Sequence, residues 1–252
     1  DIGSTASKVA VLGEREVLFV LPTGWNSKET AREIQEKLGV EWGVGVEPDG
    51  AFVVATGYGR VSVPYASKIV TEITCHARGA TFLSEPAPNT LIDVGGQDTK
   101  VVTLDEHGVS TFTMNDKCSA GTGKFLEVMA NRMGYDFDEL FDNAARGQLV
   151  QISSMCTVFA ESEVIGLMGA GVPREDIAAG VVDSVVQKVC QLARRHGLQG
   201  KIMLTGGLSE NLIFVDWMSR TLGQSVVSSE KGRYAGAIGA AILARQYAAS
   251  VA

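Results

Sequence analysis

Two short turns of matching composition, about ninety residues apart, carry the side chains best suited to chemistry. The first runs from Asp1 to Lys8 (DIGSTASK) and the second from Asp93 to Lys100 (DVGGQDTK). In each, an Asp is followed by glycine, by hydroxyl or amide side chains, and by Lys with an apolar run. Glycine lets the backbone approach phosphate, successive amides bind anions, and carboxylates hold magnesium through its waters. If the two turns face each other, they suit a nucleoside triphosphate with its Mg²⁺.

The two turns give a first set of expected site residues. We expect Asp1 and Asp93 to hold magnesium, and Gln97 or Asp98 to orient the attacking water, because phosphoryl transfer chiefly demands positioning and charge stabilisation. The expected catalytic residues are Asp1, Asp93, Gln97 and Asp98. The expected phosphate contacts are Gly3, Ser4, Thr5, Lys8, Gly95 and Gly96.

A third element follows later in the chain, where an apolar strand at 201–204 runs into Thr205, Gly206 and Gly207. A double glycine after a strand is also an ordinary turn. Its order after the two Asp turns favours a site where adenosine approaches the backbone. At the start of the helix expected at 123–133, Gly123 is an expected nucleotide-binding residue and Glu127 or Lys124 would reach the ribose side, although a solvated helix face explains Lys124 and Glu127 equally well.

The composition is that of a globular protein with an acidic balance. The 252 residues carry a net charge of −7, with 45% hydrophobic and 20% charged side chains. That length suits one large domain or two modest ones. The negative charge argues against binding a phosphate backbone, so no nucleic acid is expected as a partner. No apolar run approaches eighteen residues and no signal-peptide pattern is present, so we expect no membrane association and a cytoplasmic location.

Apolar periodicity and turn residues predict alternating hairpins, helices and short strands. The strands are expected at 8–12, 17–21, 51–56, 81–83, 100–104, 109–114, 201–204 and 225–228. The helices are expected at 28–38, 66–77, 123–133, 138–145, 174–196, 211–222 and 234–249. Because no apolar residues precede Asp1, we also expect the first strand to be shortened on that side.

The proline-containing loop at 85–88 is the expected crossover between two domains, since proline disfavours both a helix and a central strand. We expect a first domain of residues 1–88 plus 233–252, and a second of residues 89–232.

The four cysteines are of two kinds. Cys190 lies on an apolar helix face and is expected in the core, where a thiol behaves as a small hydrophobe. Cys75 and His76 are neighbours on an expected helix and point apart, which disfavours binding of one metal by both. We expect them either to be structural or to contact the residues of a site without contacting its ligand.

Cys118 and Cys156 each precede an expected helix, and we expect a strand before Cys156. Helix N-termini lower the pKa of a thiol and stabilise negative charge. Two thiolates cannot complete a four-cysteine iron–sulfur site, whereas a twofold dimer supplies four. From the spacing alone, two isolated buried thiols remain the simpler interpretation.

The order of Asp turn, Asp turn and strand with two glycines resembles the phosphate-1, phosphate-2 and adenosine motifs of the acetate kinase, sugar kinase, Hsp70 and actin superfamily. This resemblance implies an α/β fold with two ribonuclease H-like (actin/Hsp70-type) domains and a nucleotide cleft between them. It also implies that the last helix returns to the first domain.

Four longer strings are similar to the activator (component A) of 2-hydroxyacyl-CoA dehydratases and to the ATPase subunits of benzoyl-CoA reductase. They are residues 72–80 (EITCHARGA), 93–100 (DVGGQDTK), 115–123 (NDKCSAGTG) and 156–164 (CTVFAESEV). The resemblance covers essentially the whole chain in the same order. It implies a homodimer in which Cys118 and Cys156 of each subunit hold one shared [4Fe-4S] cluster. Ser119, where alanine is more usual, does not affect ligation.

The same resemblance implies ATP and Mg²⁺ as further cofactors. Hydrolysis would drive transfer of one low-potential electron to a 2-hydroxyacyl-CoA dehydratase or related reductase, with a ferredoxin or flavodoxin as electron donor.

Two other functions are compatible with the turns. A small-molecule kinase would need a catalytic base on a substrate-binding insertion, for which this length leaves little room. A nucleotide-binding actin-like module without redox chemistry is the non-enzymatic alternative. A P-loop around Cys118 to Lys124 is excluded, because that pattern requires glycine at 118 and Ser or Thr at 125, where Phe125 stands.

Overall fold

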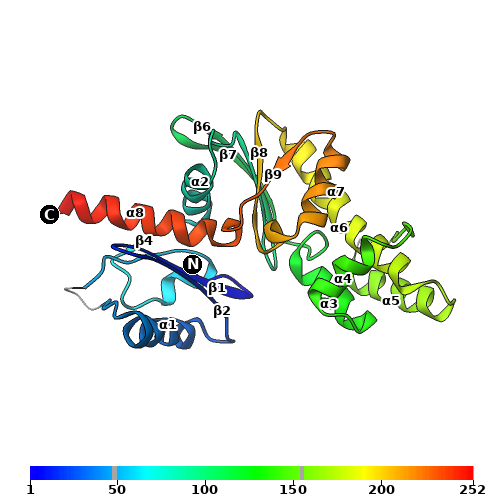
Figure 1. Ribbon diagram of the computed structural model, residues 1–252, viewed down its shortest axis with the longest axis horizontal. Helices are drawn as coiled ribbons and strands as arrows, with labels where there is room; N and C mark the ends of the chain where they lie inside the picture. Colours follow the sequence, from blue (N-terminus) through cyan, green and yellow to red (C-terminus); the bar gives the residue numbers. More distant parts are fainter. Residues whose placement is uncertain (47–49, 154–155, 252) are drawn as a thin grey trace.

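A mixed sheet with helices on both faces lies at the centre of the molecule, beside a smaller unit built on a hairpin (Figure 1). The computed structural model describes residues 1–46, 50–153 and 156–251. Within them, the central sheet has the order β7-β6-β5-β8-β9, with β5 antiparallel to β6 and parallel to β8. Its strands are β5 (Thr90–Val94), β6 (Thr99–Asp105), β7 (Gly108–Asn115), β8 (Ile202–Gly206) and β9 (Val226–Val227).

The inner strands β5, β6 and β8 of the central sheet are buried on both faces, whereas no residue of the edge strand β7 is buried. Successive strand residues point to opposite faces, so Leu91 packs toward α2 (Glu72–Leu83) while Ile92 packs toward α6 (Arg174–His196). The helix α7 (Leu212–Leu222) joins α6 on that second side. The carboxyl ends of β5 and β8 are thereby fixed next to each other.

The smaller unit is formed by the N-terminal part of the chain. It contains the antiparallel hairpin β1 (Ala6–Leu12) and β2 (Glu16–Pro22), the helix α1 (Ser27–Trp42), and the parallel pair β3 (Val54–Ala55) and β4 (Lys68–Ile69). Asp1 and Ile2 lie between these pieces: Asp1 pairs with Lys8, and the Ile2 N–H donates to the Thr56 carbonyl at 2.9 Å. Val17, Ile34 and Leu38 belong to its core.

The C-terminal helix α8 (Ala235–Val251) runs between the hairpin and α2, and contacts β1, β3 and α2 (Figure 1). Small residues allow this approach. A methyl group on Gly239 would lie 2.7 Å from the carbonyl carbon of Cys75 on α2, closer than side-chain carbons are found. Glycine is therefore needed where the two helices cross.

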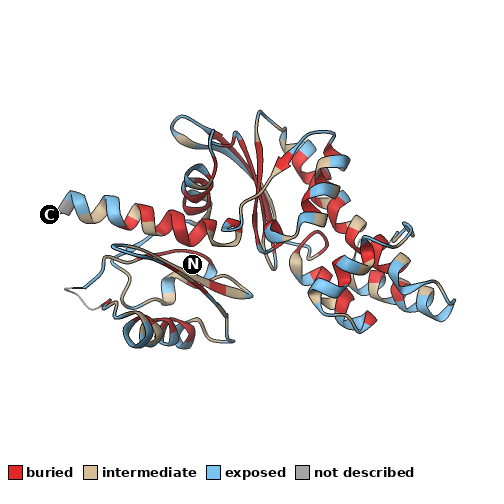
Figure 2. Cartoon of the chain, viewed as in Figure 1, coloured by how far each residue is buried: buried red, intermediate tan, exposed pale blue. Residues whose placement is uncertain are grey.

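Three helices form the end of the molecule opposite the C-terminus (Figure 1). They are α3 (Gly123–Met133), α4 (Phe137–Ala144) and α5 (Thr157–Gly169). A capping box begins α4, in which the Asp136 carboxylate accepts from the Glu139 N–H at 2.8 Å. Much of α5 is exposed (Figure 2), including Val158 at 65% and Phe159 at 68%.

Most expected elements are confirmed, including both hairpins, α3, α6 and a C-terminal helix that packs on the smaller unit. The helix expected at 66–77 is wrong: 68–69 form β4, and α2 begins only after Thr71, whose hydroxyl accepts from the Thr74 N–H. The strand expected at 81–83 is wrong as well, because these residues form the last turn of α2. There the Thr81 hydroxyl donates to the Ala77 carbonyl at 3.0 Å.

Two further expectations need correction. The strand at 51–56 shrinks to Val54–Ala55, and residues 149–153 before Cys156 form no strand. Ser154 and Met155 lie outside the described residues. The domain boundary at 88 stays a prediction, because α2 packs on both α8 and the central sheet. No helix in the described ranges has both the length and the apolar character that crossing a membrane requires.

Candidate nucleotide and metal site

The two Asp turns lie side by side at the carboxyl end of β5. A methyl group on Gly96 would lie 2.9 Å from Cβ of Thr5, so the second turn touches the first. The Gly95 N–H donates to the Asp98 carbonyl at 2.9 Å, which closes the second turn on itself. A cavity of about 290 Å³ opens between the turns.

The cavity collects residues from distant parts of the sequence. Of the expected site residues, it is lined by Asp1, Gly3, Ser4, Thr5, Lys8, Asp93, Gly95, Gly96, Asp98, Gly123, Lys124, Glu127, Gly206 and Gly207. It is also lined by residues that were not expected to contact the nucleotide or the metal, among them Tyr58, Glu72, His76, Lys100 and Arg233.

Gln97 and Asp98 are adjacent but occupy different surroundings. Gln97 is exposed and does not line the cavity, whereas Asp98 is buried within it and accepts a hydrogen bond from the Tyr58 hydroxyl at 3.1 Å. The tight turn sends neighbouring side chains in different directions. Of the two expected water-orienting residues, only Asp98 therefore faces the cavity.

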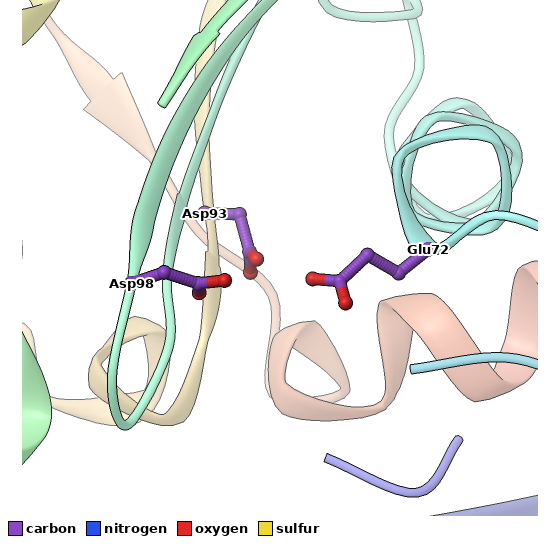
Figure 3. Close-up of side chains that lie close together, drawn as sticks. All are labelled: Glu72, Asp93 and Asp98. Atoms are coloured by element: carbon purple, nitrogen blue, oxygen red, sulfur yellow. The ribbon is translucent and has the colours of Figure 1, made fainter. Parts of the chain in front are cut away.

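Three carboxylates converge in this cavity (Figure 3). Glu72 at the start of α2, Asp93 at the end of β5 and Asp98 in the turn place carboxylate oxygens within 4.8 Å of one another. The Lys100 ammonium lies among them, 2.7 Å from Asp98 Oδ1 and 3.5 Å from Asp93 Oδ2, and it also pairs with Glu72. Sequence reasoning gave Glu72 no role, because the helix was expected at 66–77, which placed Glu72 inside the helix and not at its first residue.

The charges of this cluster stabilise one another. Burial raises the pKa of Asp93, but the opposite effects of His76, Lys100 and Lys8 outweigh burial and hold that pKa below its ordinary value. Burial lowers the pKa of Lys100, but Asp93, Glu72 and Asp98 raise it above its ordinary value. Asp93 and Lys100 are therefore charged at neutral pH.

Asp1 adds a fourth carboxylate from the first turn. Its side chain is 4% exposed and its Oδ2 lies 3.5 Å from the Lys8 ammonium. Among the described residues, this buried oxygen has no hydrogen-bond partner. A buried carboxylate oxygen left without a hydrogen bond is costly, and carboxylates are the ligands that Mg²⁺ prefers. The three converging carboxylates, with Asp1 in the same cavity, thus fit a magnesium ion held through its waters.

The third expected element meets the second turn directly. Gly206 ends β8 with φ of +87°, and a methyl group there would lie 2.9 Å from Asp93 Oδ1. Only glycine combines this φ with so close an approach. Gly207 begins the short 3-10 helix η2 (Gly207–Glu210) and is exposed at the cavity wall.

The start of α3 is hydrogen-bonded to the second turn. The N–H groups of Gly123 and Lys124 donate to the carbonyls of Gly95 and Gly96 at 3.0 and 2.9 Å. The Lys124 ammonium donates to Glu127 at 3.0 Å, with both side chains partly in solvent. A ribose contact and a solvated helix face therefore both remain compatible with this pair.

The two exposed cysteines lie on one surface. Ser119 follows Cys118, Thr157 follows Cys156, and the two hydroxyls are 2.6 Å apart. Cys156 is the N-cap of α5, whereas Cys118 lies five residues before α3 begins. The two cysteines are thus exposed and the residues that follow them are in contact, so they are not isolated, buried thiols.

The other two cysteines are buried. Burial raises the pKa of Cys75, and raises that of Cys190 to about 12, so both are protonated thiols at neutral pH. Thiolates are the ligands of iron–sulfur clusters. The surroundings of Cys75 and Cys190 are therefore those of packing residues.

Comparison with known proteins identifies a family for the chain. A model of the BadF/BadG/BcrA/BcrD ATPase family matches residues 1–244. The chain is 41% identical to the (R)-2-hydroxyglutaryl-CoA dehydratase activating ATPase of Acidaminococcus fermentans, over 99% of this chain and 96% of that protein.

Comparison with solved structures agrees with the family found from the sequence. The activator of the 2-hydroxyisocaproyl-CoA dehydratase from Clostridium difficile, with bound ADPNP, superposes with a TM-score of 0.91 at 41% identity, over 99% of this chain and 94% of that one. A ROK family glucokinase from Streptomyces griseus shares the fold alone, with a TM-score of 0.57 at 15% identity over 97% of both chains. The expected α/β fold of two actin-like domains is confirmed. The chain belongs to the BadF/BadG/BcrA/BcrD ATPase family.

Proposed function

We propose that the protein binds and hydrolyses magnesium ATP in the cavity between the two Asp turns. The observation that carries this proposal is the convergence of three carboxylates beside two glycine turns, together with Asp1 in the same cavity, one of whose buried oxygens has no hydrogen-bond partner among the described residues. Asp1 and Asp93 would hold Mg²⁺ through its waters, with Glu72 beside them. When bound, magnesium supplies positive charge against the phosphates.

The remaining roles follow from position. The backbones of Gly3 to Thr5 and of Gly95 and Gly96 would contact the phosphates, while Gly206 and Gly207 leave room for adenosine. Asp98 would orient the attacking water, because it faces the cavity and Gln97 does not. Positioning and charge stabilisation are the main demands of phosphoryl transfer.

We further infer that hydrolysis serves electron transfer. The names of the relatives from A. fermentans and C. difficile indicate activators of 2-hydroxyacyl-CoA dehydratases. By similarity, the protein would donate one low-potential electron to such a dehydratase or a related reductase, and would receive it from a ferredoxin or flavodoxin.

The redox site would be a [4Fe-4S] cluster shared by two copies of the chain. Cys118 and Cys156 are neighbouring, exposed and able to supply two thiolates, so two chains supply four. Val158 and Phe159, whose apolar side chains are exposed, lie in the first turn of α5, the helix that Cys156 caps. Apolar surface of this kind is typical of an interface, which supports a homodimer formed around the cysteines.

Hydrogen bonds connect the second Asp turn to the loop that carries Cys118. The second turn is hydrogen-bonded to the first residues of α3, and the buried Thr99 hydroxyl donates to the Gly121 carbonyl at 2.6 Å. Gly121 lies three residues after Cys118. A nucleotide that binds the two states of this turn with different affinity would shift the position of the loop.

Hydrolysis is tested with Asp93→Asn, which keeps the shape of the side chain but removes its charge. We expect ATP turnover to fall by about two to three orders of magnitude, as for loss of other groups that stabilise charge in a transition state. Circular dichroism and the melting temperature would establish that the variant is folded. Turnover close to that of the wild type in a folded variant would refute the site assignment.

The cluster is tested by iron content of protein prepared without oxygen. About four irons per dimer are expected in the wild type and in the buried-thiol control Cys190→Ala, and almost none in Cys118→Ala or Cys156→Ala. A Cys156→Ala protein that keeps four irons would refute the symmetric arrangement.

A further inference from the structure

His76 is a buried imidazole in the cavity wall to which the proposed hydrolysis assigns no role. It lies on α2 one turn after Glu72 and is 7% exposed. Burying a polar ring without hydrogen bonds is unfavourable. The atoms around its two nitrogens therefore indicate what it does.

The Nδ1 atom of His76 faces the adjacent ends of β5 and β8. Nδ1 lies 3.4 Å from the Thr205 hydroxyl and 3.3 Å from Asp93 Oδ1, and that hydroxyl donates its proton to the same Oδ1 at 3.1 Å. Because the Thr205 hydroxyl already donates its only proton to Asp93, its oxygen can only accept a hydrogen bond from the His76 ring. The network thus assigns the imidazole proton to Nδ1. His76 and Thr205 together hold one oxygen of Asp93, while the other faces Lys100.

The Nε2 side faces the first turn. A methyl group on Gly236 would lie 2.7 Å from His76 Nε2 and 3.0 Å from Asp1 Oδ2, so these two atoms border the same small volume. Burial disfavours a charged ring, so the neutral imidazole has its one proton on Nδ1. Nε2 is then an acceptor, and so is the Asp1 carboxylate. Asp1 Oδ2 is the buried oxygen without a hydrogen-bond partner among the described residues. Two acceptors that face each other are satisfied by a donor between them, and a water molecule supplies two O–H groups.

We propose that His76 is a positioning residue that aligns the carboxylates of both turns. It acts on Asp93 through Nδ1 and Thr205, and on Asp1 through a water shared with Nε2. This inference rests on the proposed magnesium ATP hydrolysis. A single side chain on α2 would then fix the two carboxylates that are proposed to hold the hydrated metal ion.

The test compares three substitutions at His76 in the otherwise intact dimer. His76→Leu keeps volume without hydrogen bonds, His76→Asn restores a donor near Nδ1, and His76→Gln restores a polar group near Nε2 only. His107→Leu, at a histidine that is 87% exposed, is the matched control. The readouts are the melting temperature without ligand, the affinity for Mn²⁺ in the presence of ADP, and kcat and KM for ATP.

We expect His76→Leu to weaken Mn²⁺ affinity by about 10- to 100-fold, the usual effect of losing a group that orients metal-binding residues, and to lower kcat. His76→Asn should recover more of both than His76→Gln, and the control should match the wild type. If His76→Leu changes only the melting temperature, the residue is structural and the proposal fails, as it does if all three variants lose the same affinity. A wild-type protein that neither binds Mn²⁺ with ADP nor hydrolyses ATP would instead overturn the proposed function, and this inference with it.

Discussion

Replacing Gly239 by alanine tests how closely α8 packs against α2. The new methyl group would lie 2.7 Å from the carbonyl carbon of Cys75 and 2.8 Å from the Gly79 nitrogen, and the Cys75 carbonyl oxygen is closer still. All of these are backbone atoms, so no side chain can rotate away. To reach the 3.4 Å of ordinary contact, the Cys75 carbonyl carbon alone requires the helices to separate by about 0.7 Å, and the Cys75 carbonyl oxygen requires more.

The magnitude follows from two opposing effects. Alanine in place of glycine favours a helix by about 1 kcal/mol. Overpacking a buried contact costs about 1–3 kcal/mol, and the upper end applies because a whole helix must move. We therefore expect a net loss of about 2 kcal/mol in the free energy of unfolding. ATP turnover should fall as well, because His76 follows Cys75 directly and would be drawn away from Asp93.

Urea unfolding measures the change, with Gly39→Ala as the matched control. Gly39 is exposed on α1, and a methyl group there would meet no atom within 4 Å. Gly39→Ala should therefore gain up to about 1 kcal/mol from helix propensity alone. If Gly239→Ala is as stable as Gly39→Ala, the two helices are not packed as tightly as the backbone distances indicate.

Three further predictions concern charge and capping. Lys100→Met leaves three carboxylates without their shared cation, so it should lower the free energy of unfolding by about 3–5 kcal/mol in the absence of Mg²⁺. Added Mg²⁺ should restore part of the lost melting temperature. A melting temperature that does not respond to Mg²⁺ would contradict this. Burial lowers the pKa of His196 below its ordinary 6.5, so the unfolded chain takes up this proton first; the stability present above pH 6.5 should be lost as pH falls through the lower folded pKa. Urea unfolding between pH 7.5 and 5 should show a smaller loss in His196→Gln than in the wild type, and equal losses would refute the assignment. Asp136→Ala removes the capping box of α4 and should cost about 0.5–2 kcal/mol in thermal unfolding, whereas Asp136→Asn, which can still cap, should cost less.

The sequence by itself determined the elements whose signals are local. A glycine turn flanked by apolar strands specified both hairpins, and the periodicity between Pro173 and Gly197 specified α6 to the residue. It also indicated Asp1, Asp93 and Asp98 as neighbours, because the two turns have a similar pattern of residue types and the resemblance to a superfamily implies that they face each other. The start of α2 was misplaced, since the apolar residues from 66 to 71 fit a helix as well as a short strand.

Only the tertiary structure decided which side chains complete the site. Glu72 and His76 are more than fifteen residues from Asp93 in the sequence, and they meet it because α2 crosses the end of β5. Likewise, the direction of Asp98 into the cavity and of Gln97 into solvent depends on the path of one turn. Periodicity reports which face of an element is buried, but not against what it is buried. The partner of a buried face depends on where a glycine, such as Gly239 at the contact of α8 with α2, allows two helices to pack closely.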